Sequence, residues 1–91
     1  MEWDIKEHRN VVKILNKLPN HIVKKYDLWK QIIWNHGPNK LLEFPGFNDD
    51  ALVGDNYGHR SSRLNIKYRV IYFKREEKLT VYVLKITPHK Y

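Results

Sequence analysis

Arginine, histidine and tyrosine side chains recur in the last third of this sequence, and together they could cleave RNA. They are Arg60, Arg63, Arg69, His89 and Tyr91. Cleavage at the ribose 2′-hydroxyl needs a base for the hydroxyl proton and a proton donor for the departing 5′-oxygen. Histidine, with an ordinary pKa of about 6.5, can do either near neutral pH, and tyrosine can stack on a base or relay a proton. Arginine keeps its proton and binds phosphate oxygens with two N–H groups, which suits it to stabilising the charge of the attacked phosphate.

The net charge of the chain lies in the same segment. Residues 1–56 contain eight Lys or Arg and eight Asp or Glu, whereas residues 57–91 contain nine Lys or Arg and two acidic residues, which accounts for the whole net charge of +7. Cations spread along a small sheet form the kind of surface that binds a polyanion such as nucleic acid. A membrane surface is a poorer partner, because that interaction favours a basic amphipathic helix and the helical half of this chain is neutral.

Length and composition favour one soluble, cytoplasmic domain over residues 1–91. The chain has no cysteine, which excludes thiol catalysis and Cys-based zinc sites. No apolar run approaches the roughly 20 residues that span a bilayer, and the N-terminus does not have the pattern of a signal peptide. Asn48-Asp49-Asp50 could supply metal ligands, but loop acids without a nearby histidine pair are more often turn formers or caps. We therefore expect no metal and no other cofactor.

Hydrophobic spacing predicts two helices in the first half of the chain. Apolar residues at three- and four-residue intervals predict a short helix over residues 7–18, which Pro19 ends. A second helix is predicted from Asn20, its expected N-cap, to about residue 35, where Gly37-Pro38 stops it. The two helices are expected to form a hairpin.

Three strands are predicted to follow, over residues 57–66, 68–74 and 79–87, with the last two joined as an antiparallel hairpin. Residues 3–5 could form an edge strand, and residues 40–56 predict a loop with one short helical turn. The order β-α-α-β-β-β predicts an α+β fold, in which the helical hairpin packs on one face of a small twisted antiparallel sheet. Function is then expected on the open face.

Strand alternation predicts which side chains share that open face. The side chains expected beneath the helices are Val70, Tyr72, Leu84 and Ile86, and those expected on the open side are Arg69, Lys85 and the His89 end of the last strand. On the preceding strand, alternation allows either Arg60 with Ser62 or His59 with Ser61 and Arg63. Arginines on strands commonly have no role beyond presenting a charged surface to water. Arg69 is a stronger candidate for function, because it interrupts an otherwise hydrophobic strand.

Four segments resemble the RelE/ParE superfamily of bacterial type II toxins, and within it the RelE/HigB-like branch of mRNA interferases. They are Leu52-Val-Gly-Asp55, Gly58-His-Arg-Ser-Ser-Arg-Leu-Asn65, Tyr68-Arg-Val-Ile-Tyr72 and Ile86-Thr-Pro-His-Lys-Tyr91. No segment is diagnostic alone, but their order and spacing after a helix pair make the resemblance specific. It implies a RelE-like fold, a ribosome-dependent endoribonuclease that cuts mRNA without a metal, and a cognate antitoxin protein as partner.

The resemblance also implies roles for individual residues. Arg69 matches the arginine of the family's Tyr-Arg motif, which contacts the scissile phosphate, and Arg60 matches a commonly basic position on the preceding strand. With these two stabilising charge, His89 is expected to be the general acid or base and Tyr91 to orient the substrate. The residues expected to hold flanking phosphates or ribosomal RNA are His59, Arg63, Lys67 and Lys85.

Two other functions fit the same sequence. A ParE-like poison of DNA gyrase would keep the fold and bind a protein, although the Tyr-Arg motif and the late histidine speak against it. A non-catalytic RNA-binding module would share the basic sheet and would bind RNA with steep salt dependence but without cutting it.

Overall fold

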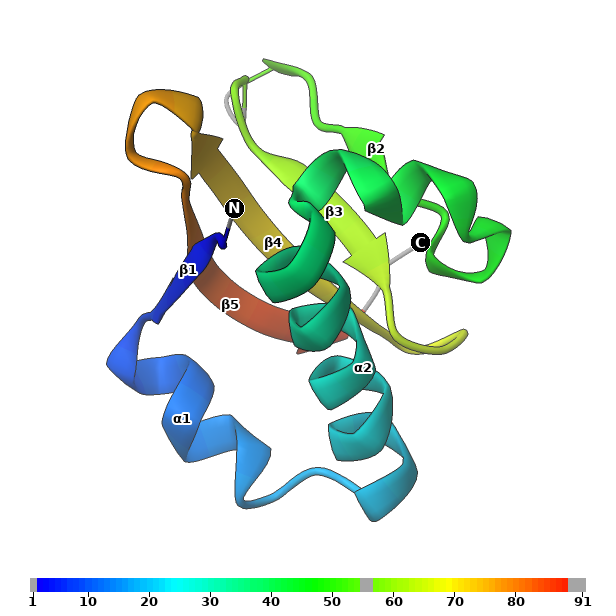
Figure 1. The fold of residues 1–91 in the computed structure, drawn as a ribbon. Coiled ribbons are helices and arrows are strands. Elements are labelled where there is room, and N and C mark those ends of the chain that lie inside the picture. Colours follow the sequence, from blue (N-terminus) through cyan, green and yellow to red (C-terminus); the bar gives the residue numbers. More distant parts are fainter. Residues whose placement is uncertain (1, 55–56, 89–91) are drawn as a thin grey trace.

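A five-stranded sheet organises the molecule, for which the computed structural model describes residues 2–54 and 57–88 (Figure 1). The strands are β1 (Asp4–Glu7), β2 (Asp50–Ala51), β3 (Arg60–Arg63), β4 (Tyr68–Arg75) and β5 (Thr80–Pro88). Their spatial order is β1-β5-β4-β3-β2. The predicted α+β class and the predicted β4–β5 hairpin are confirmed.

The prediction of a wholly antiparallel sheet is wrong at one edge. β1 pairs in parallel with β5, whereas the other three strand pairs are antiparallel. The physical reason is the connection that follows β1. The chain leaves β1 through helices rather than through a tight turn, and only such a long crossover can join parallel strands.

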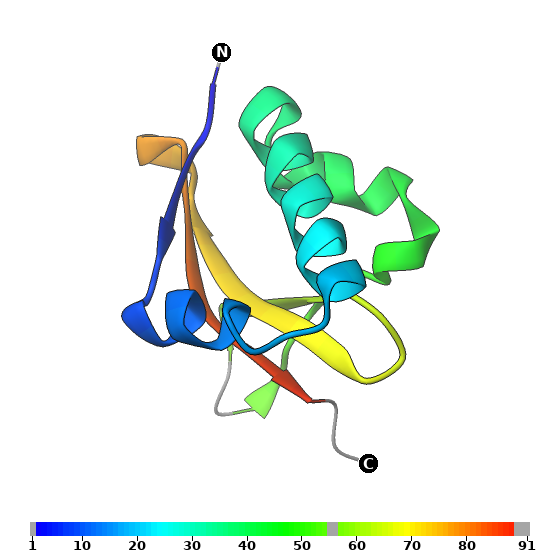
Figure 2. The ribbon, with the colours of Figure 1, turned by 90° about the horizontal axis from the view of Figure 1, so that it is seen from below.

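Two α-helices, α1 (Arg9–Leu15) and α2 (Asn20–His36), lie over one face of the sheet (Figure 2). The Nδ1 atom of His8 accepts a hydrogen bond from the backbone N–H of Asn10 and so caps α1. α2 begins directly after Pro19, one residue earlier than a cap at Asn20 would place it. Gly37, with φ of +84°, ends α2.

The apolar face predicted for α2 is the centre of the core. Its buried side chains are Ile22, Tyr26, Trp29, Ile32 and Ile33. They pack with Val11 of α1 and with the sheet residues Val70, Tyr72, Val81, Val83 and Ile86. Because each of these side chains is removed from water, the helices and the sheet stabilise one another mainly through apolar burial.

Leu84 was expected under the helices, and this prediction is wrong. A bulge in the β4–β5 ladder, between Ile71 and Tyr72, leaves Leu84 without a partner, so that Tyr72 pairs with Val83. A bulge inserts one extra residue and therefore reverses the alternation beyond it. Val83 is accordingly buried, with 1% of its surface exposed, and Leu84 is half-buried.

The segment predicted as a loop contains more structure than expected. Two short 3₁₀ helices, η1 (Pro38–Glu43) and η2 (Pro45–Phe47), follow α2, pack beside it and lead into β2. Leu41 and Phe47 are buried there. Among the described residues, no helix is long and apolar enough to cross a membrane. The organisation of residues 1–91 as a single domain stays a prediction.

Candidate phosphate-binding site

The face of the sheet opposite the helices presents three rows of side chains across β3, β4 and β5. Strand register places them as a basic row of Thr87, Arg69 and Arg63, a middle row of Lys85, Ile71 and Ser61, and an aromatic row of Tyr82, Phe73 and His59. Strand alternation alone had left two choices for β3. The structure selects His59, Ser61 and Arg63 as the side chains that share a face with Arg69.

A hollow of about 180 Å³ lies at the basic row. Arg63 and Arg69 line it from the strands, and Asp50 lines it from β2. The turn between β3 and β4 closes one side, where the Oδ1 atom of Asn65 accepts hydrogen bonds from the backbone N–H groups of Lys67 (2.9 Å) and Tyr68 (2.6 Å). The hollow is therefore lined by two arginine residues and by a turn whose backbone is held by Asn65.

The two arginines form an electrostatically unfavourable pair. Arg63 and Arg69 face each other across β3 and β4, and like charges in directly opposed positions destabilise a sheet. Within residues 2–54 and 57–88, neither arginine forms an ion pair, and the buried Nε of Arg69 has no hydrogen-bond partner. A bound anion would offset both costs, because phosphate oxygens accept the forked hydrogen bonds of a guanidinium.

Asp50 supplies the one carboxylate that lines this hollow in the described part of the chain. Its Oδ1 accepts a hydrogen bond of 2.8 Å from the backbone N–H of Ala51, and its backbone pairs with Ser61. Sequence reasoning missed Asp50, because it grouped the residue with its neighbours as a turn former. No local signal marks the two-residue strand β2, which brings Asp50 onto the open face.

Arg60 lies on the opposite face of the sheet, and this corrects the expectation that Arg60 and Arg69 act on one phosphate. Arg60 pairs across the sheet with the buried Tyr72, and its Nε (2.9 Å) and a terminal nitrogen (2.6 Å) donate to Oδ1 of Asp49. Burial lowers the pKa of Arg60, but the hydrogen bonds and negative charge of Asp49 outweigh it, and the pKa is raised. Arg60 is therefore held in an ion pair away from the hollow.

Asp49 is the centre of a buried polar network. Its side chain is 1% exposed, and its Oδ2 accepts hydrogen bonds from the hydroxyls of Ser62 and Tyr72. Ser62 in turn accepts a hydrogen bond of 2.9 Å from Nε1 of Trp29 on α2. Burial and the Asp49 carboxylate raise the pKa of Tyr72 above its ordinary value. The network holds the segment before β2 against β3, β4 and α2, and so positions Asp50.

The remaining residues predicted for the site are distributed over the open face. Lys85 is exposed in the middle row, and His59 is half-buried in the aromatic row. Lys67 is exposed in the β3–β4 turn, with its Nζ 5.3 Å from the centre of the Tyr68 ring. His89 and Tyr91 fall outside the described residues. The last described residue, Pro88, pairs with Tyr68, which itself lines the hollow.

The described residues do not favour a metal site. Among residues 2–54 and 57–88, no group of three or more His, Asp or Glu side chains gathers at a point. A hard cation such as Mg²⁺ or Ca²⁺ needs several oxygen ligands, and the hollow offers a single carboxylate beside two arginines.

Solved structures with the same fold were found by comparison with known proteins. No protein-family model and no curated protein matches the sequence. A chain of the archaeal RelE–RelB complex from Pyrococcus horikoshii OT3 matches with a TM-score of 0.76 and 26% identity, over 97% of this chain and 96% of that one. The protein belongs to the RelE/ParE superfamily. The HigB-like branch is not specifically supported and stays a prediction.

Two further structures extend the comparison within this superfamily. YafQ from Escherichia coli matches with a TM-score of 0.75 and 16% identity, over 97% of this chain and 94% of that one. A chain of the YoeB–YefM complex from Staphylococcus aureus matches with a TM-score of 0.74 and 16% identity, over 99% and 100%. At such identities the likeness shows the RelE-like fold and leaves function to be argued from the site.

Proposed function

We propose that this RelE-like protein is the toxin of a type II toxin–antitoxin system and that it cleaves mRNA on the ribosome without a metal. The observation on which the proposal rests is the pair of arginines, Arg63 and Arg69, which line a hollow together with Asp50 and form no ion pair with any other described residue. The fold supports it, because the similar structures are RelE, YafQ and YoeB toxins.

The reaction that fits this arrangement is attack by the ribose 2′-oxygen on the adjacent phosphorus. A base accepts the 2′-hydroxyl proton, the 2′-oxygen forms a bond to phosphorus, and the bond from phosphorus to the 5′-oxygen breaks. An acid then protonates the departing 5′-oxygen, which leaves a 2′,3′-cyclic phosphate and a 5′-hydroxyl. Arg63 and Arg69 stabilise the extra negative charge of the pentavalent phosphorane, which is greater in the transition state than in the substrate.

Proton transfer is assigned to Asp50 and His89. The Asp50 carboxylate is the described group in the hollow that can accept the 2′-hydroxyl proton. His89 comes directly after Pro88, the strand residue that pairs with Tyr68. His89 is proposed as the proton donor to the 5′-oxygen. Tyr91 is proposed to orient the substrate. Lys67 and Lys85 bind flanking phosphates or ribosomal RNA, contacts that add affinity without sequence preference.

The partners follow from the same surface. A cognate antitoxin is proposed because RelE and YoeB, which have the same fold, are known in complexes with RelB and YefM, and a partner that binds only the folded toxin also stabilises it. The ribosome and mRNA are the proposed targets, so that the protein acts in the cytoplasm. Arg60 is proposed to hold the Asp49 segment in place rather than to contact substrate.

Inducible expression tests the proposal. Wild type is expected to arrest growth and to produce new 5′ ends in transcripts, and the product of the adjacent reading frame is expected to relieve both effects. Arg69→Ala combined with His89→Ala should abolish arrest while the protein stays folded by circular dichroism. Arg9→Ala, a loss of one exposed arginine on α1, is the matched control and should arrest growth like wild type.

Two results would contradict parts of this proposal. Transcript cleavage by the Arg69→Ala, His89→Ala double variant would show that the reaction takes place elsewhere on the molecule. DNA damage on induction, with intact transcripts, would assign the protein to gyrase poisoning and remove the ribonuclease function altogether.

A further inference from the structure

The aromatic row lies apart from the proposed reaction site and consists of three nearly parallel rings. Phe73 of β4 stacks on Tyr82 of β5, with ring centres 4.9 Å apart and an angle of 11° between the ring planes. On its other side, Phe73 stacks on His59, with ring centres 5.8 Å apart and an angle of 22°. All three side chains are half-buried. The row therefore crosses the sheet on the side opposite the core.

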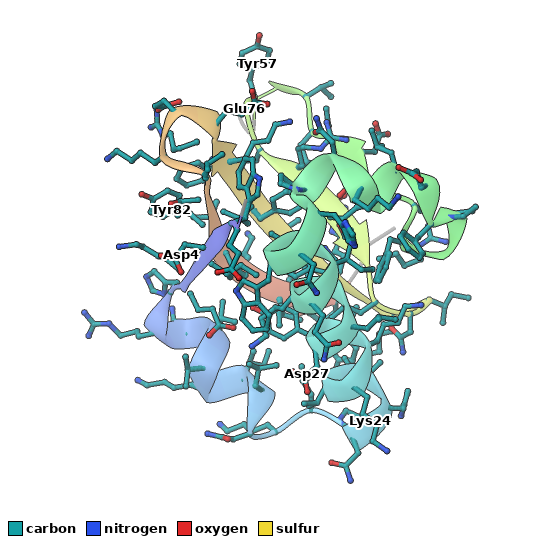
Figure 3. All side chains as sticks on the ribbon, in the orientation of Figure 1. Asp4, Lys24, Asp27, Tyr57, Glu76 and Tyr82 are labelled. Carbon is teal, nitrogen blue, oxygen red and sulfur yellow. The ribbon has the colours of Figure 1, made fainter. Side chains whose placement is uncertain are left out.

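Phe73 is the middle ring of the row, stacked on His59 at one side and on Tyr82 at the other. A base that extends the row would therefore stack at its His59 end or its Tyr82 end. Next to His59 lies a hollow of about 320 Å³. It is lined by Tyr57, Gly58, His59, Phe73, Lys74 and Arg75. A Cβ atom added at Gly58 would meet nothing within 4 Å. Tyr57 is 88% exposed and projects from the top of the molecule in the view of Figure 3.

Two cations flank the row. β3, β4 and β5 contain no Asp or Glu. The guanidinium of Arg75 lies 5.6 Å from the centre of the Phe73 ring, and Lys6 of β1 pairs in register with Tyr82. Within the described ranges neither cation forms an ion pair, whereas Lys74 is bound to Glu76 at 3.2 Å. Aromatic rings flanked by free cations are what a single-stranded nucleic acid needs, since every base can stack and every linkage carries a charge.

We propose that the aromatic row and its hollow bind unpaired bases of the same RNA strand whose phosphate lies at Arg69. Phe73 and Arg69 are on one strand and on one face, four residues apart, which separates them by roughly 13 Å at 3.3 Å per residue. That distance spans a few nucleotides of extended RNA. The inference rests on the proposed function for the identity of the strand, and it adds a base-stacking subsite that gives affinity at a distance from the cleaved bond.

Binding of a short RNA that cannot be cleaved tests the subsite. The probe is a fluorescently labelled 2′-O-methyl oligonucleotide of about ten residues, compared with an abasic strand of the same length and charge by fluorescence anisotropy. For wild type, the intact strand is expected to bind about 5- to 100-fold more tightly than the abasic strand, because stacking is lost with the bases. Tyr82→Leu and Phe73→Leu should each lower this ratio while leaving affinity for the abasic strand unchanged.

Phe44→Leu is the matched control, because Phe44 is 40% exposed and packs edge-on against Phe47, away from the row; it should keep the wild-type ratio. If Phe73→Leu fails to fold, Tyr82→Leu provides the same test. Equal affinity of wild type for both strands overturns the proposal. So does an unchanged ratio in Tyr82→Leu, or weakened binding of the antitoxin by Tyr82→Leu with no effect on RNA, which would assign the row to a protein partner.

The outcome can be separated from that of the ribonuclease proposal. Transcript cleavage by wild type together with equal affinity for both strands would refute the subsite alone. Tighter binding of the intact strand without any cleavage in translating cells would refute the ribonuclease function and leave the subsite in place.

Discussion

Asp49 and Asp50 are adjacent in the chain, yet the structure predicts opposite consequences for the same substitution at each. Asp49 is buried and ion-paired to Arg60, whereas Asp50 is exposed and lines the proposed reaction site. Asp49→Asn keeps the size of the side chain and removes its charge. It leaves the Arg60 guanidinium, 26% exposed, without its one ion-pair partner among the described residues.

The cost of Asp49→Asn can be worked from the network. Breaking a buried ion pair by removing one partner costs about 3–5 kcal/mol. The partial exposure of Arg60 and the oxygen that asparagine retains reduce this to about 2–3 kcal/mol. A domain of this size has a free energy of unfolding of roughly 5–14 kcal/mol, and each kcal/mol corresponds to about 4–8 °C in Tm. We therefore expect Tm to fall by about 10–20 °C.

Asp50→Asn should leave the stability almost unchanged and impair cleavage. An exposed substitution changes stability by about 0.5 kcal/mol or less, whereas loss of a general base lowers the rate of cleavage by about 10²- to 10⁴-fold. Thermal melts by circular dichroism and mapping of transcript 5′ ends measure the two effects on the same pair of variants. A melting temperature of Asp49→Asn within about 3 °C of wild type, or full cleavage by Asp50→Asn, would refute the assignment of anchor and base.

Three further predictions concern stability and binding. Gly37→Ala should lower the free energy of unfolding by about 1–3 kcal/mol, because Gly37 has φ of +84° and an added Cβ would lie 2.7 Å from Nε1 of Trp3; an unchanged urea midpoint would contradict this. Burial and Asp49 raise the pKa of Tyr72. Above about pH 10 the unfolded chain therefore loses the phenolic proton while the folded chain keeps it. For this group, the free energy of unfolding should then fall by about 1.4 kcal/mol for each further pH unit. Urea titrations of Tyr72→Phe should therefore show a shallower decline than wild type, and parallel curves would exclude the effect. Arg63→Ala should reduce the slope of log affinity against log salt by about 0.7 for single-stranded RNA, as expected for one lost phosphate contact, and an unchanged slope would mean that Arg63 does not touch the strand.

The strongly patterned elements of this fold were predictable from the sequence. α2 has an apolar stripe over 17 residues with a glycine stop, and β4 is dense in β-branched and aromatic residues, so local signals and final structure agree. No local sequence signal predicts the parallel pairing of β1, because that pairing depends on the position of β5 in the folded sheet. β2 has only two residues and exists because the Asp49 network holds it against β3.

The candidate site was predictable only where a local pattern in a strand marks the residue. Arg69 was identified correctly as a residue of the open face, since it is a charge within a hydrophobic strand. The choice between Arg60 and Arg63 depends on which of them meets Asp49, a contact between a loop and a strand that alternation cannot reveal. The bulge at Leu84 reverses the alternation of side chains within β5, and no residue in that segment predicts a bulge.

The position of β5 has a consequence for the order in which this chain can assemble as it is made. β5 lies between β1 and β4, so β1 has no neighbouring strand until residues 80–83 have been synthesised. Contacts so distant in sequence form late, and a nascent chain that still lacks β5 has neither the centre of the sheet nor Thr87, which completes the basic row beside Arg69. Under the proposed function, a ribosome that makes this protein would meet an incomplete toxin surface until β5 has been synthesised.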